Sequence, residues 1–138
     1  GGRLDDLSEA LPRIKSRLGR LNPAPTREIP ILIGGGGEKK TLRYTAEHAH
    51  IWHGFGEAET IKHKCAVLDD WCAKVGRDPA EIERSTGVGD SSPEDVGEAL
   101  VAAGATLFTI GVDGQKKYDL GQVRDWIAWR DERNRAAA

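Results

Sequence analysis

Short apolar segments alternate with longer amphipathic ones four times along this chain, and this order constrains the fold more than any other feature. Each apolar segment has the length of a buried strand, and the apolar residues of the segment after it recur every three or four positions, as on a helix. The expected strand–helix units cover residues 29–49, 49–76, 82–104 and 105–135. Strands that alternate with helices favour a parallel sheet with right-handed crossovers. The sequence therefore predicts an α/β fold.

A further helix is expected before the first unit. Leucine and isoleucine recur every three or four positions between residues 4 and 21, and two prolines, Pro23 and Pro25, follow this pattern. The helix after the first strand is expected at residues 38–49, and residues 133–138 are expected to fray. A chain of 138 residues is long enough for one domain with its own core.

Four strand–helix units are compatible with two architectures. One is a small open sheet covered by helices on both faces, and the other is half of an eight-stranded barrel. In the second, the leading helix belongs to a unit whose strand is missing. The sequence contains no methionine and begins with Gly1 and Gly2, so we expect a piece cut from a longer polypeptide. Both architectures stay open on these patterns.

Four consecutive glycines, Gly34, Gly35, Gly36 and Gly37, follow the first predicted strand, and Glu38 opens the predicted helix. Glycine lets a ligand approach the backbone closely, and the first N–H groups of a helix have no partner within it. A strand, a glycine-rich turn and a helix N-terminus can together hold a phosphate. The run could equally be a plain tight loop, because it matches neither the dinucleotide-binding fingerprint nor the P-loop. Both interpretations stay open on these residues alone.

The loops that follow the strands matter most if the fold is a barrel, because they then gather at one end of it. In that case the loops at residues 34–37, 53–57, 89–92 and 111–116 share one opening. His53 is the histidine that we expect nearest to a ligand. No residue of the chain stands out as a catalytic acid, base or nucleophile.

Three histidines, His48, His50 and His53, lie close together in the sequence. On an extended strand His48 and His50 share one face while His53 points to the other. A metal site needs at least three converging ligands, so we expect no metal here. Trp52, in the same segment, is expected to pack in the core, with stacking on a cofactor ring as the alternative.

Composition and charge exclude several kinds of partner. The net charge is −2 and the sequence pI is about 6.1, which does not favour nucleic acid. No apolar stretch reaches the ~18 residues of a membrane span, and no signal peptide is visible, so we expect a cytoplasmic protein. Cys65 and Cys72 lie seven residues apart on one predicted helix, about 10.5 Å at 1.5 Å per residue, too far for a disulfide. We expect two buried thiols in a reducing compartment.

Four segments resemble the C-terminal half of the luciferase-like monooxygenases, and most of all their deazaflavin-dependent oxidoreductase branch. They are residues 30–43, PILIGGGGEKKTLR; residues 46–52, AEHAHIW; residues 76–79, GRDP; and residues 103–108, AGATLF. Relatives commonly have an aspartate where this chain has His50. The resemblance implies a (β/α)8 TIM barrel, of which this chain supplies strands five to eight and the preceding helix.

Members of this family bind coenzyme F420 or FMN at one end of the barrel and act on a small-molecule substrate. The resemblance implies that the turn after strand five contacts the cofactor phosphate. We therefore expect cofactor contacts at Gly34, Gly35, Gly36 and Gly37, with Glu38 and His53 beside them.

Two functions follow from these expectations. The chain is the C-terminal part of an F420- or FMN-dependent oxidoreductase and is inactive alone, or it is a non-catalytic half-barrel that self-associates. An open sheet leaves unpaired backbone groups on its edge strands. We therefore expect a homo-oligomer or association with a missing N-terminal half-barrel.

Overall fold

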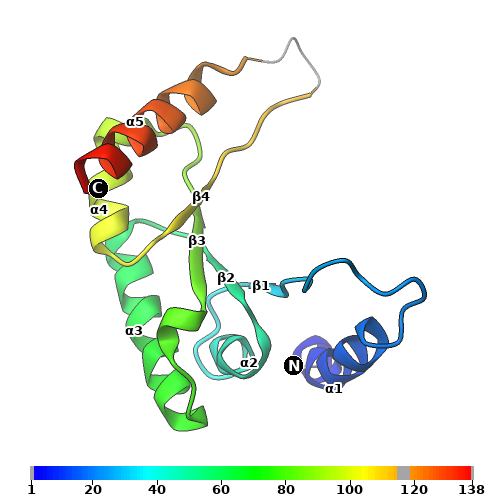
Figure 1. The fold of residues 1–138 in the computed structure, drawn as a ribbon. Coiled ribbons are helices and arrows are strands. Elements are labelled where there is room, and N and C mark those ends of the chain that lie inside the picture. Colours follow the sequence, from blue (N-terminus) through cyan, green and yellow to red (C-terminus); the bar gives the residue numbers. More distant parts are fainter. Residues whose placement is uncertain (1, 115–118, 138) are drawn as a thin grey trace.

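The computed structural model describes residues 2–114 and 119–137, and contains a four-stranded parallel sheet with helices packed on it (Figure 1). The strands are β1 (Leu32–Gly34), β2 (Ile51–Gly54), β3 (Glu83–Gly87) and β4 (Leu107–Thr109). The helices are α1 (Gly2–Leu18), α2 (Thr41–His48), α3 (Ala58–Val75), α4 (Pro93–Ala102) and α5 (Gly121–Ala137), with a short 3-10 helix, η1 (Pro79–Glu81). The α/β prediction is confirmed.

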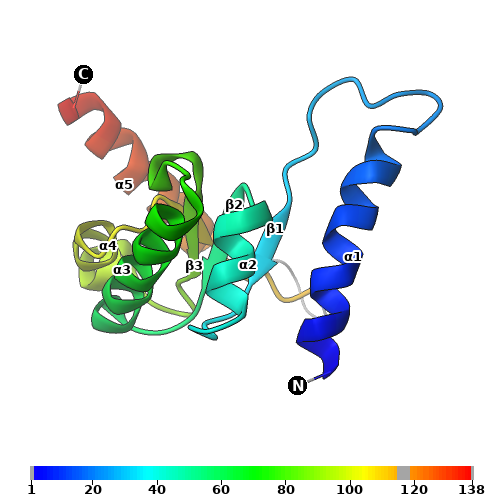
Figure 2. The ribbon, with the colours of Figure 1, turned by 90° about the horizontal axis from the view of Figure 1, so that it is seen from below.

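The strand order distinguishes between the two expected architectures. The strands follow one another in sequence order, β1-β2-β3-β4, and every neighbouring pair is parallel. Right-handed crossovers that always step in the same direction place their helices on one face of the sheet. Figure 2 shows α2, α3 and α4 side by side over one face, with α1 and α5 at the two ends. This is the arrangement of consecutive units in a (β/α)8 barrel, not of a sheet covered on both faces.

The core lies between the sheet and the helices. Trp52 of β2 is fully buried there, as expected, against α2 and α3. Cys65 and Cys72 are buried on the inward side of α3 and are both free thiols, which confirms their predicted burial. A smaller cluster joins Leu11 of α1 to Ile33 of β1 and to α2. These contacts fix α2 and α3 behind the carboxyl ends of β1 and β2.

The face of the sheet opposite the helices is called the inner face below. Side chains alternate along a strand, so Ile33 and Trp52 face the helices. Their neighbours in the sheet point the other way, and the inner face is formed by Leu32, Gly34, Ile51, His53, Glu83, Ser85, Gly87, Leu107 and Thr109. Leu32 is 53% exposed, and Phe55, just after β2, is 68% exposed. The described residues thus leave this face uncovered.

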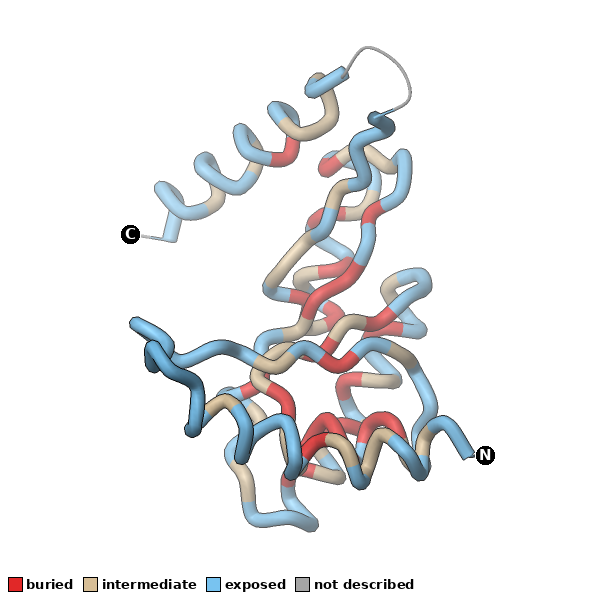
Figure 3. Tube along the Cα trace, turned by 90° about the vertical axis from the view of Figure 1, so that its right-hand side faces the viewer, coloured by how far each residue is buried: buried red, intermediate tan, exposed pale blue. Residues whose placement is uncertain are grey.

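Helices α1 and α5 lie beyond the two edge strands. Each buries a single residue, Leu11 in α1 and Trp126 in α5, and most of their length is exposed in Figure 3. Both helices therefore have little packing on the sheet compared with α2 and α3. No helix in residues 2–114 and 119–137 is long and apolar enough to cross a membrane.

Several predicted boundaries are wrong. The helix expected from Glu38 begins at Thr41, because the Leu42 amide donates to the Gly37 carbonyl oxygen over 3.0 Å and closes a wide turn first. The leading helix ends at Leu18 instead of residue 21. The expected fraying tail is helical to Ala137, and β1 begins at Leu32 although its predicted unit begins at residue 29.

Candidate functional site

Three of the loops at the carboxyl end of the sheet begin with a glycine in the left-handed region. Gly35 has φ 121°, Gly56 has φ 125° and Gly89 has φ 56°, and they follow β1, β2 and β3 within two residues. Other residues rarely adopt this backbone conformation, so glycine is what lets the chain turn over the sheet edge. The fourth predicted loop, residues 111–116, extends beyond the described residues.

The glycine-rich turn, residues 34–40, has three of its carbonyl groups held from the helix side. The indole Nε1–H of Trp52 donates to the Gly35 oxygen over 2.9 Å, and that of Trp71 donates to the Glu38 oxygen over 2.7 Å. The Leu42 amide holds the Gly37 oxygen. The turn is therefore a fixed element and not a loose loop.

Holding these carbonyls also orients the amides that share their peptide planes. In a trans peptide the C=O and N–H groups point in opposite directions, so the amides of Gly36, Glu38 and Lys39 are directed away from the three donors. Within the described residues, none of these amides donates to a protein acceptor. Neighbouring free N–H groups in a turn form an anion-binding concavity. The geometry suits an anion even though the turn is not the start of a helix.

The four glycines are not equivalent. A side chain at Gly35 is disfavoured by its φ of 121°, and a Cβ at Gly37 would lie 2.8 Å from Oγ1 of Thr41. At Gly36 a Cβ would meet only the flexible end of Lys64, at 3.5 Å, and at Gly34 only a backbone oxygen at 3.9 Å. The backbone conformation at Gly35 and the contact with Thr41 at Gly37 thus explain why glycine stands at these two positions. Open space at the other two is what close approach of a ligand requires.

The carboxylate of Glu38 is engaged with helix α3. Its Oε1 accepts from Nζ of Lys64 over 2.5 Å and lies 3.0 Å from Nε2 of His63. The hydrogen bond from Lys64, followed by that from His63, lowers the pKa of Glu38. Glu38 can therefore offer an anion its amide, while its negative charge is balanced by α3.

His53 lies on the inner face beside the glycine-rich turn. It pairs with Gly34 in the β1–β2 register, and its carbonyl oxygen accepts the Gly35 amide over 2.9 Å. Its Nδ1 lies 2.8 Å from Oγ of Ser85 on β3. Ser85 has no feature in the sequence that marks it as a partner of His53. Strand alternation alone could not find it, because the register between β2 and β3 determines that it faces His53.

The other two histidines lie away from this turn. His48 ends α2, so the prediction that it shares the face of an extended strand with His50 is wrong. His50 precedes β2, where its Nδ1 accepts the Ile31 amide over 2.9 Å and its Nε2 lies 3.3 Å from Glu28. Over residues 2–114 and 119–137, no group of three or more His, Cys, Asp or Glu side chains could hold a metal ion.

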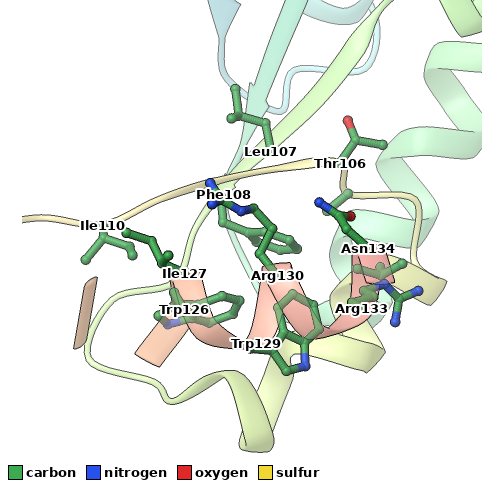
Figure 4. A pocket seen from close by; sticks show the side chains of 12 residues that line it. Thr106, Leu107, Phe108, Ile110, Trp126, Ile127, Trp129, Arg130, Arg133 and Asn134 are labelled. Carbon is green, nitrogen blue, oxygen red and sulfur yellow. The ribbon is translucent and has the colours of Figure 1, made fainter. Parts of the chain in front are cut away.

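A cavity of about 400 Å³ lies between β4 and α5 (Figure 4). β4 is at the other edge of the sheet from β1, which the glycine-rich turn follows. Its base is an aromatic cluster in which Phe108 lies 5.0 Å from Trp126 and 6.0 Å from Trp129, between ring centroids. Figure 4 shows Arg130 and Asn134 of α5 at its rim. The cavity lies along β4, which is an edge strand of the sheet.

The family model described as luciferase-like monooxygenase matches residues 11–137. No curated protein sequence matches the chain. Among solved structures, the coenzyme F420-dependent tetrahydromethanopterin reductase from Methanopyrus kandleri is 18% identical, with a TM-score of 0.40, over 52% of this chain and 22% of the reductase. The chain thus matches about a fifth of that enzyme's length. Because the family model matches nearly the whole chain, the protein belongs to the luciferase-like monooxygenase family of oxidoreductases.

Proposed function

We propose that this chain is the part of a flavin- or deazaflavin-dependent oxidoreductase that holds the phosphate of the cofactor. The observation that carries the proposal is the set of three free amides, of Gly36, Glu38 and Lys39, at the carboxyl end of β1. Because the chain belongs to the luciferase-like monooxygenase family, the anion that we propose for this site is the phosphate of a flavin or deazaflavin cofactor. Coenzyme F420 is our first candidate and FMN is the alternative, following the resemblance of residues 30–43.

The residues of the turn fit a phosphate group. Its amides are preorganised by Trp52, Trp71 and Leu42 before any ligand arrives, so little conformational entropy is lost on binding. Open space at Gly34 and Gly36 leaves room for the phosphate to approach. The bound cofactor supplies the hydride chemistry, and this chain contributes binding and orientation.

A substitution at Gly36 tests the phosphate site without breaking the turn. A Cβ there would meet only the flexible end of Lys64, so we expect Gly36→Val to fold but to obstruct the ligand. We expect the Kd for FMN, for F420 and for inorganic phosphate to rise at least about tenfold, the equivalent of one strong hydrogen bond. Gly19→Val is the matched control, since Gly19 follows the last residue of α1 and a Cβ there has no atom closer than 3.9 Å. Equal affinities in both variants and the wild type would sink the phosphate assignment.

We expect a partner to pair with the open edges of the sheet. The number of helices indicates whether this partner is a second copy or a different half-barrel. A (β/α)8 barrel has eight strands and eight helices, and the described residues provide four strands and five α-helices. If a second copy closed the barrel, α5 of one copy and α1 of the other would compete for the same place beside the joined edge strands. A segment with four strands and three helices, beginning and ending in a strand, completes the barrel without this conflict. We therefore favour an N-terminal half-barrel over a second copy.

Light scattering combined with hydrogen exchange tests this choice. We expect the chain on its own to show no discrete dimer, with fast exchange of the outward amides on β1 and β4. A discrete dimer with both edges protected would instead support the self-associating half-barrel, inactive in isolation.

A further inference from the structure

We infer that His53 presents its Nε2–H group to a ligand on the inner face, and that Ser85 fixes the ring in this tautomer. The inference rests on the proposed function, because it assigns a contact to the ring end of a cofactor whose phosphate lies at the glycine-rich turn.

The imidazole of His53 is held on two sides. Ser85 is 1% exposed, and its Oγ lies 2.8 Å from Nδ1 of His53. The ring of Phe55 meets the imidazole edge-on, with centroids 4.7 Å apart and an interplanar angle of 82°. The imidazole therefore has a defined orientation on a face that is otherwise open.

The hydrogen bond between Ser85 and His53 determines which ring nitrogen of the neutral imidazole carries the proton. Most buried polar groups have a hydrogen-bond partner, and within the described residues Nδ1 of His53 is the side-chain partner of the Ser85 hydroxyl. The hydroxyl proton of Ser85 is satisfied only if it is donated to this nitrogen. If Ser85 donates, Nδ1 accepts, and the single proton of the neutral ring stays on Nε2. No described residue accepts a hydrogen bond from Nε2, so this donor is left for a ligand.

The neighbouring positions leave room for such a ligand. Gly34 pairs with His53 in the sheet and has no side chain, so the space between the turn and Nε2 is open on the β1 side. Along the inner face of the four strands the other titratable side chain is Glu83, which pairs with Ile51 two residues before His53.

An N–H donor in this position recognises an oxygen acceptor. Flavin and deazaflavin rings both have carbonyl oxygens on their pyrimidine portion, so both fit the chemistry of Nε2–H. Phosphate alone, held at the turn, would not need His53. His53 thus acts as a ring-recognition residue, and Ser85 as a positioning residue behind it.

Two substitutions at His53 test the roles of Nδ1 and Nε2 separately. His53→Gln keeps an N–H donor near the place of Nε2, whereas His53→Asn keeps a polar group near Ser85 but has no donor at the tip. We expect the Kd of His53→Gln for FMN and F420, measured by fluorescence, to stay within about threefold of wild type. His53→Asn should weaken both about tenfold, which is one hydrogen bond at 1.4 kcal/mol per decade. The affinity for inorganic phosphate should be unchanged in both variants.

A second measurement tests the role of Ser85 directly. Long-range ¹H–¹⁵N spectra, recorded where the imidazole is neutral, should show the proton of His53 on Nε2 alone, and Ser85→Ala should give a mixture of tautomers. A proton on Nδ1 in the wild type, or equal cofactor affinity in His53→Gln and His53→Asn, overturns the inference and leaves the phosphate site standing. Failure of the wild type to bind either FMN or F420 overturns both.

Discussion

The indole groups of Trp52 and Trp71 hold the two ends of one glycine-rich turn, at the carbonyl oxygens of Gly35 and Glu38. Trp52 reaches the turn from the core of the sheet and Trp71 from helix α3. The direction of the turn's amides is therefore set by the packing of the helix layer. This relationship makes the anion site sensitive to substitutions that never touch a ligand.

Trp52→Phe should both destabilise the chain and weaken anion binding. The substitution removes the donor to Gly35 and leaves space in a fully buried position. Loss of a buried hydrogen bond together with a small cavity costs about 2–3 kcal/mol. Urea denaturation measures the free energy of unfolding, and titration with inorganic phosphate measures the binding.

Trp71→Phe is the matched variant, because it removes the same kind of hydrogen bond at a half-buried position. We expect it to lower the free energy of unfolding by about 1 kcal/mol or less, but to weaken phosphate binding as Trp52→Phe does. If Trp71→Phe left binding unchanged, the orientation of the amides would not depend on the Glu38 carbonyl.

Lys64→Gln should raise the pKa of Glu38. In the wild type the hydrogen bond from Lys64, followed by that from His63, lowers this pKa. A carboxyl whose pKa is lowered by folding contributes stability above its unfolded pKa, and this contribution is lost as the pH falls through the folded value. An NMR titration of the Glu38 carboxyl carbon should therefore have a lower midpoint in the wild type than in Lys64→Gln. Identical midpoints would show that the ion pair does not persist in solution.

The sequence predicted the order of the elements because each signal was local. Helices α3 and α4 show this well, since they lie within the predicted units of residues 49–76 and 82–104. The burial of Cys65 and Cys72 likewise followed from their spacing of seven residues on one predicted helix. Local patterns of this kind survive in the tertiary structure because packing agrees with them.

What the sequence could not predict depends on contacts between distant residues. The start of α2 was predicted three residues early, because helix propensity does not reveal that Leu42 reaches back to Gly37. The pairing of His53 with Ser85 requires the register of β2 and β3, which spans 32 residues of sequence. Trp52 was expected to pack in the core, with stacking on a cofactor ring as the alternative, and its hydrogen bond to the Gly35 oxygen was not predicted. Each of these features is a hydrogen bond that follows from the fold.

Thr86→Val should stabilise the chain. Thr86 is fully buried on β3, and its Oγ1 has no hydrogen-bond partner among the described residues. Valine has nearly the same shape without the unpaired hydroxyl, so the free energy of unfolding should rise by about 1 kcal/mol. Thr45→Val is the control, because Oγ1 of Thr45 donates to the Thr41 oxygen over 2.9 Å, and its loss should lower stability by a similar amount. An unchanged or lower stability in Thr86→Val would indicate that Oγ1 is satisfied in solution.

Cys65 and Cys72 should be unreactive in the folded chain. Burial raises the pKa of both thiols, so less thiolate is present at pH 8, and thiolate is the form that reacts. Both side chains also face the core from α3, so a reagent reaches them only when that helix opens. With Ellman's reagent we expect both thiols to react in guanidinium, and the native chain to react at least about 100-fold more slowly, as expected when reaction requires opening. Rapid reaction of one cysteine in the native chain would mean that α3 separates locally from the sheet. Trp71 lies on the same helix and orients the glycine-rich turn. Loss of anion binding under the same conditions would therefore connect this opening to Trp71.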